Sequence, residues 1–397
     1  MKFVATKTLA LLMALMLLSL AACSSNPKPN DAATDPVLSD SETMTSTEPS
    51  QSPNSAAAGN ASSLARFADV RGGFFTGDNV LSPSEYKAED IYTYQFNEHT
   101  VFTGNETLQQ EIMENGKNPG LGIRALHEKG ITGEGVSVAI IDESIFLEPT
   151  EFADRIVDYY ECHGVQSQGG MHGNAVTSIL AGKTCGVAPS VKVYYVAAPS
   201  GLTDSTYWAE GLNWIIDKNE SLPEKDKIRV VSVSANLSGT DCDFENQEKW
   251  EDAVARAKAA GILVISCSVG TDTHFTSGGY YDYADPDNIE KARNGWWSYG
   301  QSGPEPTQEG VISVPVNFRT TVEQYDAGDF FFRYGGQGGE SWGVPYAAGV
   351  LALGWQINPQ LSPEEIKKIL IDSAYENQYG ERIIYPSAFI EMVENTL

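Results

Sequence analysis

The chain has 397 residues, of which 26 are basic and 53 acidic, so its formal net charge is −27. Its length allows one large domain or two ordinary domains, each with an ample core. The acidity argues against a nucleic-acid-binding protein, which needs a basic face, and against electrostatic docking on an anionic membrane.

The first 23 residues have the features of an export signal. Lys2 and Lys7 precede an apolar run at residues 9–18. This run is too short to span a membrane comfortably but has the length of a signal-peptide core. The next residues, 20–23, read Leu-Ala-Ala-Cys and resemble a bacterial lipobox, in which Cys23 is lipidated. We therefore expect residues 1–22 to be a lipoprotein signal peptide, and the protein to be lipid-anchored through Cys23 at the extracellular face of a bacterial cell membrane. The alternative is an ordinary signal peptide with an incidental cysteine.

Two segments separate this signal from the main domain. Residues 23–63 are rich in Ser, Thr, Ala and Pro and contain almost no large apolar side chain, so they predict a disordered tether. Residues 64–118 are mixed in composition, and four aromatic residues suggest short strands there: Tyr92, Tyr94, Phe96 and Phe102. This segment is either an N-terminal extension or a vestigial pro-region, and the sequence leaves both hypotheses open.

Residues 119–397 alternate apolar runs with amphipathic segments and are predicted to form one domain. Runs rich in β-branched residues predict strands at 136–141, 191–196, 229–234, 262–267 and 311–316. Helical spacing predicts helices at 175–181, 207–218 and 245–260, and two more at 344–355 and 362–374, the last with Ser362 as its N-cap. Nearly continuous apolar strands separated by helices form a parallel sheet covered on both faces. We therefore expect an α/β fold, a three-layer sandwich with a mostly parallel central sheet flanked by helices.

Three residues of this domain could act together chemically. Asp142 ends the first strand, His172 is one of five histidines and starts a helix beside glycine, and Ser341 lies at the start of a small-residue helix. A serine hydroxyl becomes a nucleophile when a histidine takes its proton and a carboxylate orients that histidine. Considered singly, each residue also has a structural interpretation, as a strand-end cap, a helix-start residue or a helix cap.

Taken in order, the motifs around these residues resemble those of the subtilisin-like serine peptidase family. Val-Ala-Ile-Ile-Asp ending at Asp142 matches the aspartate motif, and His172-Gly173 with its helix matches the histidine motif. Residues 339–349, Gly-x-Ser-x-x-x-Pro-x-x-Ala-Gly, match the serine motif, and the order Asp, His, Ser is that of subtilisin. The resemblance covers about residues 119–374.

The resemblance implies a peptide-bond hydrolase. Ser341 would be the nucleophile, His172 the general base and then general acid, and Asp142 the group that fixes the imidazole tautomer. It further implies that one strand end, residues 234–236, flanks the substrate backbone as an edge strand, and these candidates are Ser234, Ala235 and Asn236. The family usually has a glycine where Asn236 stands.

The chain departs from the family pattern around the oxyanion. The family's oxyanion asparagine aligns with Gly270, which has no side-chain donor, so Ser268 or Thr271 could substitute for it beside the main-chain N–H of Ser341. Other departures are Ala175 for the second histidine, Ser144 for a glycine, and Glu340 and Trp342 on either side of the nucleophile. A Glu340 carboxylate near the site would raise the pKa of His172.

Four further cysteines and one acidic cluster are candidate structural sites. An exported protein could pair Cys162, Cys185, Cys242 and Cys267, and a disulfide between Cys162 and Cys185 is one possibility. Cys267 at a strand end is expected to be a buried apolar residue. Calcium is common in the family, and four oxygen-bearing residues cluster here: Asp282, Asp285, Asp287 and Asn288. Their spacing follows no recognised calcium loop, so we expect a solvated acidic loop and no cofactor.

The leading hypothesis is a monomeric, membrane-tethered serine endopeptidase that acts on peptide or protein substrates. The alternative is a catalytically impaired pseudopeptidase, whose cleft binds peptides without cleaving them at the cell surface. A different serine-dependent hydrolase, or a structural surface lipoprotein, is a third class.

Overall fold

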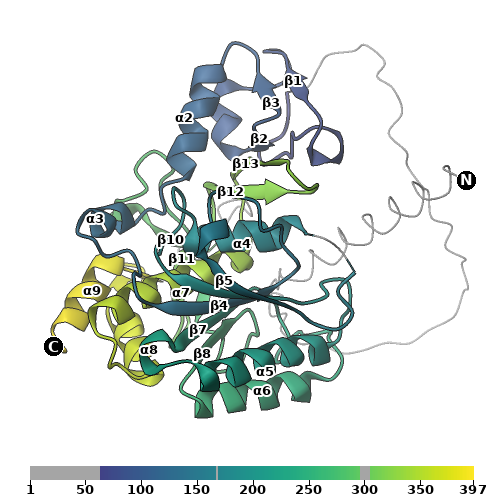
Figure 1. Ribbon diagram of the computed structural model, residues 1–397. Helices are drawn as coiled ribbons and strands as arrows, with labels where there is room; N and C mark the ends of the chain where they lie inside the picture. The colour runs from purple at the N-terminus through teal and green to yellow at the C-terminus, as the bar shows by residue number, and fades with distance from the viewer. Residues whose placement is uncertain (1–62, 167–168, 296–304) are drawn as a thin grey trace, which may run out of the picture.

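A computed structural model describes residues 63–166, 169–295 and 305–397 (Figure 1). The predicted signal peptide, Cys23 and nearly all of the predicted tether lie outside these residues. No helix within the described ranges combines the length and the apolar character that a membrane crossing requires.

Five parallel strands form the central sheet, in the order β5-β6-β4-β7-β8. They are β4 (Ser137–Asp142), β5 (Ile156–Glu161), β6 (Lys192–Ala197), β7 (Ile228–Val233) and β8 (Leu263–Ser266). Four of the five were predicted, each within one residue or two of its observed ends. The fifth, β5, escaped prediction because it is a half-exposed edge strand with a mixed pattern.

The alternation of side chains along β4 divides the core into two layers. Val138 and Ile140 pack into the cluster that contains apolar residues of α4 (Met171–Ala181) and α7 (Glu340–Ile357). Ala139 and Ile141 pack into a separate cluster with α5 (Ser205–Ser221) and α6 (Gln247–Ala259). Figure 1 shows α5 and α6 on one side of the sheet and α4 on the other. The α/β fold with a helix-covered parallel sheet is therefore confirmed.

A second five-stranded sheet, in the order β10-β9-β11-β15-β14, lies beside the first. Its strands are β9 (Thr276–Tyr280), β10 (Arg293–Asn294), β11 (Ile312–Pro315), β14 (Tyr375–Glu376) and β15 (Arg382–Ile383). The predicted strand 311–316 belongs here, not to the central sheet, because an apolar run indicates burial without specifying the pairing partner. The chain ends in α8 (Pro363–Asp372) and α9 (Pro386–Glu394). The predicted cap of α8 is confirmed, since Ser362 and Glu365 form a reciprocal capping box.

Residues 63–118 pack against the rest of the chain through a hairpin. The hairpin strands are β12 (Arg319–Gln324) and β13 (Phe330–Gly335), and β2 (Gln95–Asn97) pairs antiparallel with β13. β1 (Asn79–Leu81) pairs with β3 (Thr100–Phe102), and α2 (Glu106–Gly116) follows, with α3 (Ile123–Glu128) beyond it. In Figure 1 this N-terminal part lies over the hairpin. Of the four aromatic residues, Phe96 and Phe102 lie in strands, whereas Tyr92 and Tyr94 lie in and just after a 3₁₀ helix.

Candidate active site

Asp142 and His172 meet at the carboxyl end of β4. β4 has β6 on one side and β7 on the other, so the strand order reverses there, which is where ligands bind in parallel sheets. Asp142 is 1% exposed, and its Oδ1 lies 2.7 Å from Nδ1 of His172, the second residue of α4. Because a carboxylate only accepts hydrogen bonds, Nδ1 is the protonated nitrogen of the neutral ring. Nε2 is then left to accept a proton.

Ser341 is the second residue of α7, and a proline shapes its surroundings. Pro345 lies four residues further on and has no N–H, so it cannot donate the usual helical hydrogen bond to the Ser341 carbonyl. Ser234, which follows β7, fills that role: its Oγ donates to the Ser341 carbonyl at 2.9 Å. The end of β7 is thereby joined to the helix that carries Ser341.

The Ser341 hydroxyl points toward the end of β7. Its Oγ donates to the main-chain carbonyl of Ser234 at 3.4 Å, and within the described residues no hydrogen bond joins it directly to His172. The neighbouring Trp342 does reach the histidine, with its ring 5.3 Å from the imidazole ring at an angle of 42°. The three predicted residues thus lie around one site, with the Asp142–His172 contact made and Ser341 turned toward Ser234.

The predicted substrate strand continues directly from β7. Ala235 is buried, and its carbonyl accepts the N–H of Cys267 at 3.1 Å. The Asn236 side chain donates to the carbonyl of Asp241 at 3.3 Å. Ser234 therefore contacts Ser341, whereas Ala235 contacts the end of β8 and Asn236 contacts the loop that follows it.

The three candidates for the oxyanion donor bond within their own part of the fold. Ser268 is fully buried and accepts the N–H of Leu237 at 3.1 Å, while the Thr271 hydroxyl donates to the Ser268 carbonyl at 2.8 Å. Gly270 is exposed with φ of +83°, and a Cβ there would lie 2.9 Å from the Thr240 hydroxyl. None of their hydrogen bonds among the described residues goes to Ser341.

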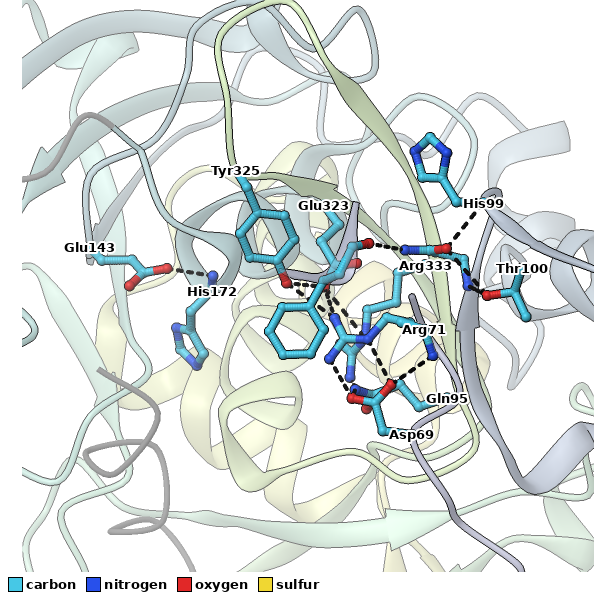
Figure 2. Close-up of polar contacts among 12 residues, drawn as sticks. Asp69, Arg71, Gln95, His99, Thr100, Glu143, His172, Glu323, Tyr325 and Arg333 are labelled. Carbon is cyan, nitrogen blue, oxygen red and sulfur yellow. Dashed lines mark hydrogen bonds and ion pairs between the residues drawn. The ribbon is translucent and has the colours of Figure 1, made fainter. Parts of the chain in front are cut away.

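Glu143 is a site residue that the sequence did not reveal. Its Oε1 accepts the main-chain N–H of His172 and, at 3.4 Å, that of Gly173. Figure 2 shows the Glu143 carboxylate directed at the main-chain nitrogen of His172. Burial raises the pKa of the Glu143 carboxyl above its usual value, against the opposing attraction of His172. The only sequence signal was a charged residue directly after Asp142.

A second acid–histidine pair lies next to Ser341. Glu340, the residue before Ser341, has its Oε1 2.8 Å from Nε2 of His274, and both side chains are nearly buried. The Glu340 carboxylate, which was expected to raise the pKa of His172, thus has His274 as its hydrogen-bonding partner. His274 follows β8 and was not singled out from the sequence, because nothing local links it to a residue 66 positions away.

The carboxylates of the acidic cluster near residue 285 bind protein partners. Lys291 binds both Asp282 and Asp285, at 3.1 and 2.9 Å, so its ammonium group stands between the carboxylates. Asp287 accepts the N–H of Gly122 and the side-chain amide of Asn118, at 2.9 Å each. The carboxylates of Asp282 and Asp285 thus share Lys291, while the carboxylate of Asp287 binds a different part of the chain.

The cysteines outside the signal region form no disulfide in the described part of the chain. Cys162 packs beneath α5, and burial raises the pKa of its thiol to about 12. Cys185 lies near Glu151 instead, so the considered Cys162–Cys185 bridge is not formed. Cys267 is buried, as its apolar surroundings predicted.

Part of the chain, including Asp142 and His172, is similar to a known protein family. Residues 133–317 match the model of the subtilase family, Peptidase_S8, a range that includes Asp142 and His172 and ends before Ser341. Serine protease AprX of Bacillus subtilis is 27% identical over 279 residues, which cover 60% of this chain and 61% of that protein. Subtilisin Savinase of Lederbergia lenta is 26% identical over 278 residues, which cover 66% and 94%.

The fold of the chain is similar to that of solved structures. A chain from the structure titled "Structural basis of subtilase cytotoxin SubAB assembly" superposes with a TM-score of 0.54 at 16% identity, over 70% of this chain and 96% of that one. This confirms the subtilisin-like fold. The present chain matches about 61% of the length of AprX.

Proposed function

We propose that this chain is a member of the subtilase family, whose model residues 133–317 match, and that it is a serine endopeptidase. In this proposal it hydrolyses peptide bonds with Ser341 as nucleophile, His172 as general base and Asp142 as the carboxylate that orients the imidazole. The observation that carries the proposal is the 2.7 Å contact between His172 and the buried Asp142, beside the helix that begins at Ser341. Peptides or proteins are the substrates that this chemistry requires.

The reaction needs one small movement first. Ser341 Oγ rotates away from the Ser234 carbonyl, which it contacts at a long 3.4 Å, so that its proton can pass to His172 Nε2. The oxygen then attacks the scissile carbonyl carbon, and the resulting imidazolium is stabilised by Asp142. His172 next gives this proton to the leaving amine, and a water molecule hydrolyses the acyl-enzyme by the same steps.

The oxyanion donor in this proposal is the main-chain N–H of Ser341. The first N–H groups of a helix have no partner within the helix, and they point toward negative charge at its N-terminus. This donor does not depend on the side chain at position 270, where the chain has glycine. The second donor is left to groups that come together when substrate binds.

A phosphonate probe that reacts with activated serines tests the proposal. The wild-type protein should be labelled and Ser341→Ala should not, while cleavage of a peptide library should fall by about 10⁴-fold or more in that variant. Ser84→Ala, which changes an exposed serine in the N-terminal part, is the matched control and should behave as wild type. Equal labelling of wild type and Ser341→Ala would contradict the catalytic proposal and favour the pseudopeptidase.

We also propose that the protein is attached to the outer face of the cell membrane by a lipid on Cys23, on the basis of the lipobox-like residues 20–23. A single cysteine accounts for attachment, so Cys23→Ser should move the protein from the membrane fraction to the soluble fraction. Retention of that variant in the membrane fraction would contradict this attachment.

A further inference from the structure

The helix that carries His172 begins without a local cap. Its N-cap residue is Gly170, which has no side chain to accept hydrogen bonds, and α4 begins at Met171. A side chain at an N-cap normally accepts the N–H of the second or third helical residue, which here are His172 and Gly173. These two N–H groups are the ones that Glu143 accepts, from 29 and 30 residues earlier in the chain.

The glycine at the cap position leaves room for this carboxylate. A Cβ on Gly170 would lie 2.2 Å from Glu143 Oε1, so any larger residue would displace the Glu143 side chain. Ser144 extends the same contact: its Oγ accepts the N–H of Gly169 at 3.0 Å, and its carbonyl accepts the N–H of Gly170 at 2.7 Å. Glu143 and Ser144, which follow Asp142, therefore accept main-chain N–H groups on both sides of the start of α4.

We propose that Glu143 is a positioning residue: its carboxylate serves as the missing N-cap of α4 and so holds the His172 imidazole in place against Asp142. The inference rests on the proposed function only where activity is concerned, since the cap itself is a feature of the fold. Asp142 and Glu143 are adjacent in sequence, so one turn of chain fixes both the imidazole and the main chain that bears it.

The charged and titratable groups around Glu143 are few. They are the Asp142 carboxylate, the His172 imidazole, and the hydroxyl of Tyr195 on β6, which donates to the Glu143 main-chain carbonyl. A carboxylate at a helix N-terminus is favoured by the helix dipole. Replacing it with an amide removes the charge but keeps an oxygen that can accept both N–H groups.

The test compares Glu143→Ala with Glu143→Gln in the full-length protein. Glu143→Ala should lower kcat by about 10- to 100-fold with KM within about 2-fold, because a small displacement of a catalytic group has effects of this size. Glu143→Gln should recover most of kcat, while the acid limb of the kcat/KM profile moves to lower pH because a negative charge near the imidazole is lost. Glu220→Ala, which removes an exposed carboxylate at the far end of α5, is the control and should match wild type.

A second measurement does not need catalysis. The Nδ1 proton of His172, bound to Asp142, should give a downfield NMR signal in wild type and Glu143→Gln that broadens or shifts in Glu143→Ala. An unchanged signal and unchanged kcat in Glu143→Ala would overturn the proposal, as would equal loss of kcat in both variants. Absence of peptidase activity in wild type, with the signal still lost in Glu143→Ala, would reject the proposed function and leave the positioning role standing.

Discussion

At the scale of single residues, the contact between Ser234 and Ser341 has a cause in the backbone. Pro345 deprives the Ser341 carbonyl of its helical donor, and the Ser234 hydroxyl replaces that donor at 2.9 Å. A buried carbonyl without any donor costs about 1–3 kcal/mol. The peptide group of Ser341 is thus held by a side chain from another part of the fold.

Ser234→Ala should therefore destabilise the protein by about 1–3 kcal/mol and lower kcat. In a Pro345→Ala background, the restored N–H of residue 345 can donate to the Ser341 carbonyl. Ser234→Ala should then lower the free energy of unfolding by much less. A double-mutant cycle by urea unfolding, with kcat measured in parallel, checks this. Strictly additive effects of the two substitutions would show that Ser234 does not replace the missing helical donor.

At this scale, the sequence singled out residues that belong to local motifs. Asp142, His172 and Ser341 each lie in a short recognisable segment, and the structure brings those segments to one site. Glu143 and His274 were missed because their roles depend on partners 29 and 66 residues away. No spacing within either segment encodes these contacts.

At the scale of elements, the sequence predicted α4 to α8 and four of the five central parallel strands, but not β5, α2, α3, α9 or the hairpin. β12 reads Arg-Thr-Thr-Val-Glu-Gln, a polar pattern, yet all six residues are buried. Their polar groups find distant partners: the Thr320 hydroxyl donates to the Met113 carbonyl in α2, and Ser178 of α4 accepts the N–H of Val322. Such a strand cannot be recognised before its partners are known, because its own residues predict exposure.

The second sheet contains a buried ion pair that makes its stability depend on pH. Arg293 of β10 binds Glu381 with two hydrogen bonds, of 2.7 and 3.0 Å, and Glu381 is fully buried just before β15. Burial alone would raise the pKa of Glu381, but the hydrogen bonds from Arg293 and Asn377 bring it below its usual value. The pair therefore stabilises the fold above the unfolded pKa of about 4.3, and this stabilisation is lost as pH falls through the lower, folded pKa.

Arg293→Ala should cost about 3 kcal/mol at pH 7, because it leaves a buried carboxylate without its cation. The difference from wild type should narrow as the pH falls below about 4, where Glu381 becomes protonated. Urea unfolding between pH 3 and pH 7 measures it. Lys368→Ala, which breaks an exposed pair with Asp372, is the control and should change stability by less than about 1 kcal/mol. If Arg293→Ala lowered the free energy of unfolding by the same amount at every pH, the pH-dependent contribution assigned to the Arg293–Glu381 pair would be wrong.

At the scale of the whole molecule, a charge network joins residues 63–118 to the hairpin. Arg71 binds Glu323 of β12 and Asp69, and Tyr325 donates to Glu323 at 2.8 Å. Arg71 and Glu323 are 4% and 0% exposed. Figure 2 shows the cluster of Asp69, Arg71, Gln95, Glu323, Tyr325 and Arg333. With β2 paired to β13, these contacts favour a permanent extension over a removable pro-region, and we propose that residues 64–118 stay in the mature protein.

Glu323→Gln should weaken this junction by about 3–5 kcal/mol, since it removes the fully buried carboxylate that both Arg71 and Arg333 approach. Amide hydrogen exchange should rise selectively across residues 63–118, and the purified wild-type and Ser341→Ala proteins should both retain the segment by mass. Glu89→Gln, which changes an exposed carboxylate on the same extension, is the comparison variant. Uniform exchange over the whole chain, or loss of the segment in wild type alone, would contradict this organisation.

The pairing of Arg71 with Glu323 also constrains the order in which the chain can assemble. The two residues are 252 positions apart, so the contact can form only after most of the chain has been synthesised. Contacts of such separation close late and slow folding. Residues 63–118 therefore cannot complete their packing until the hairpin at residues 319–335 has formed, and this hairpin packs on the helix that bears His172. The environment of His172 thus depends on contacts that form late in folding and not on local structure alone.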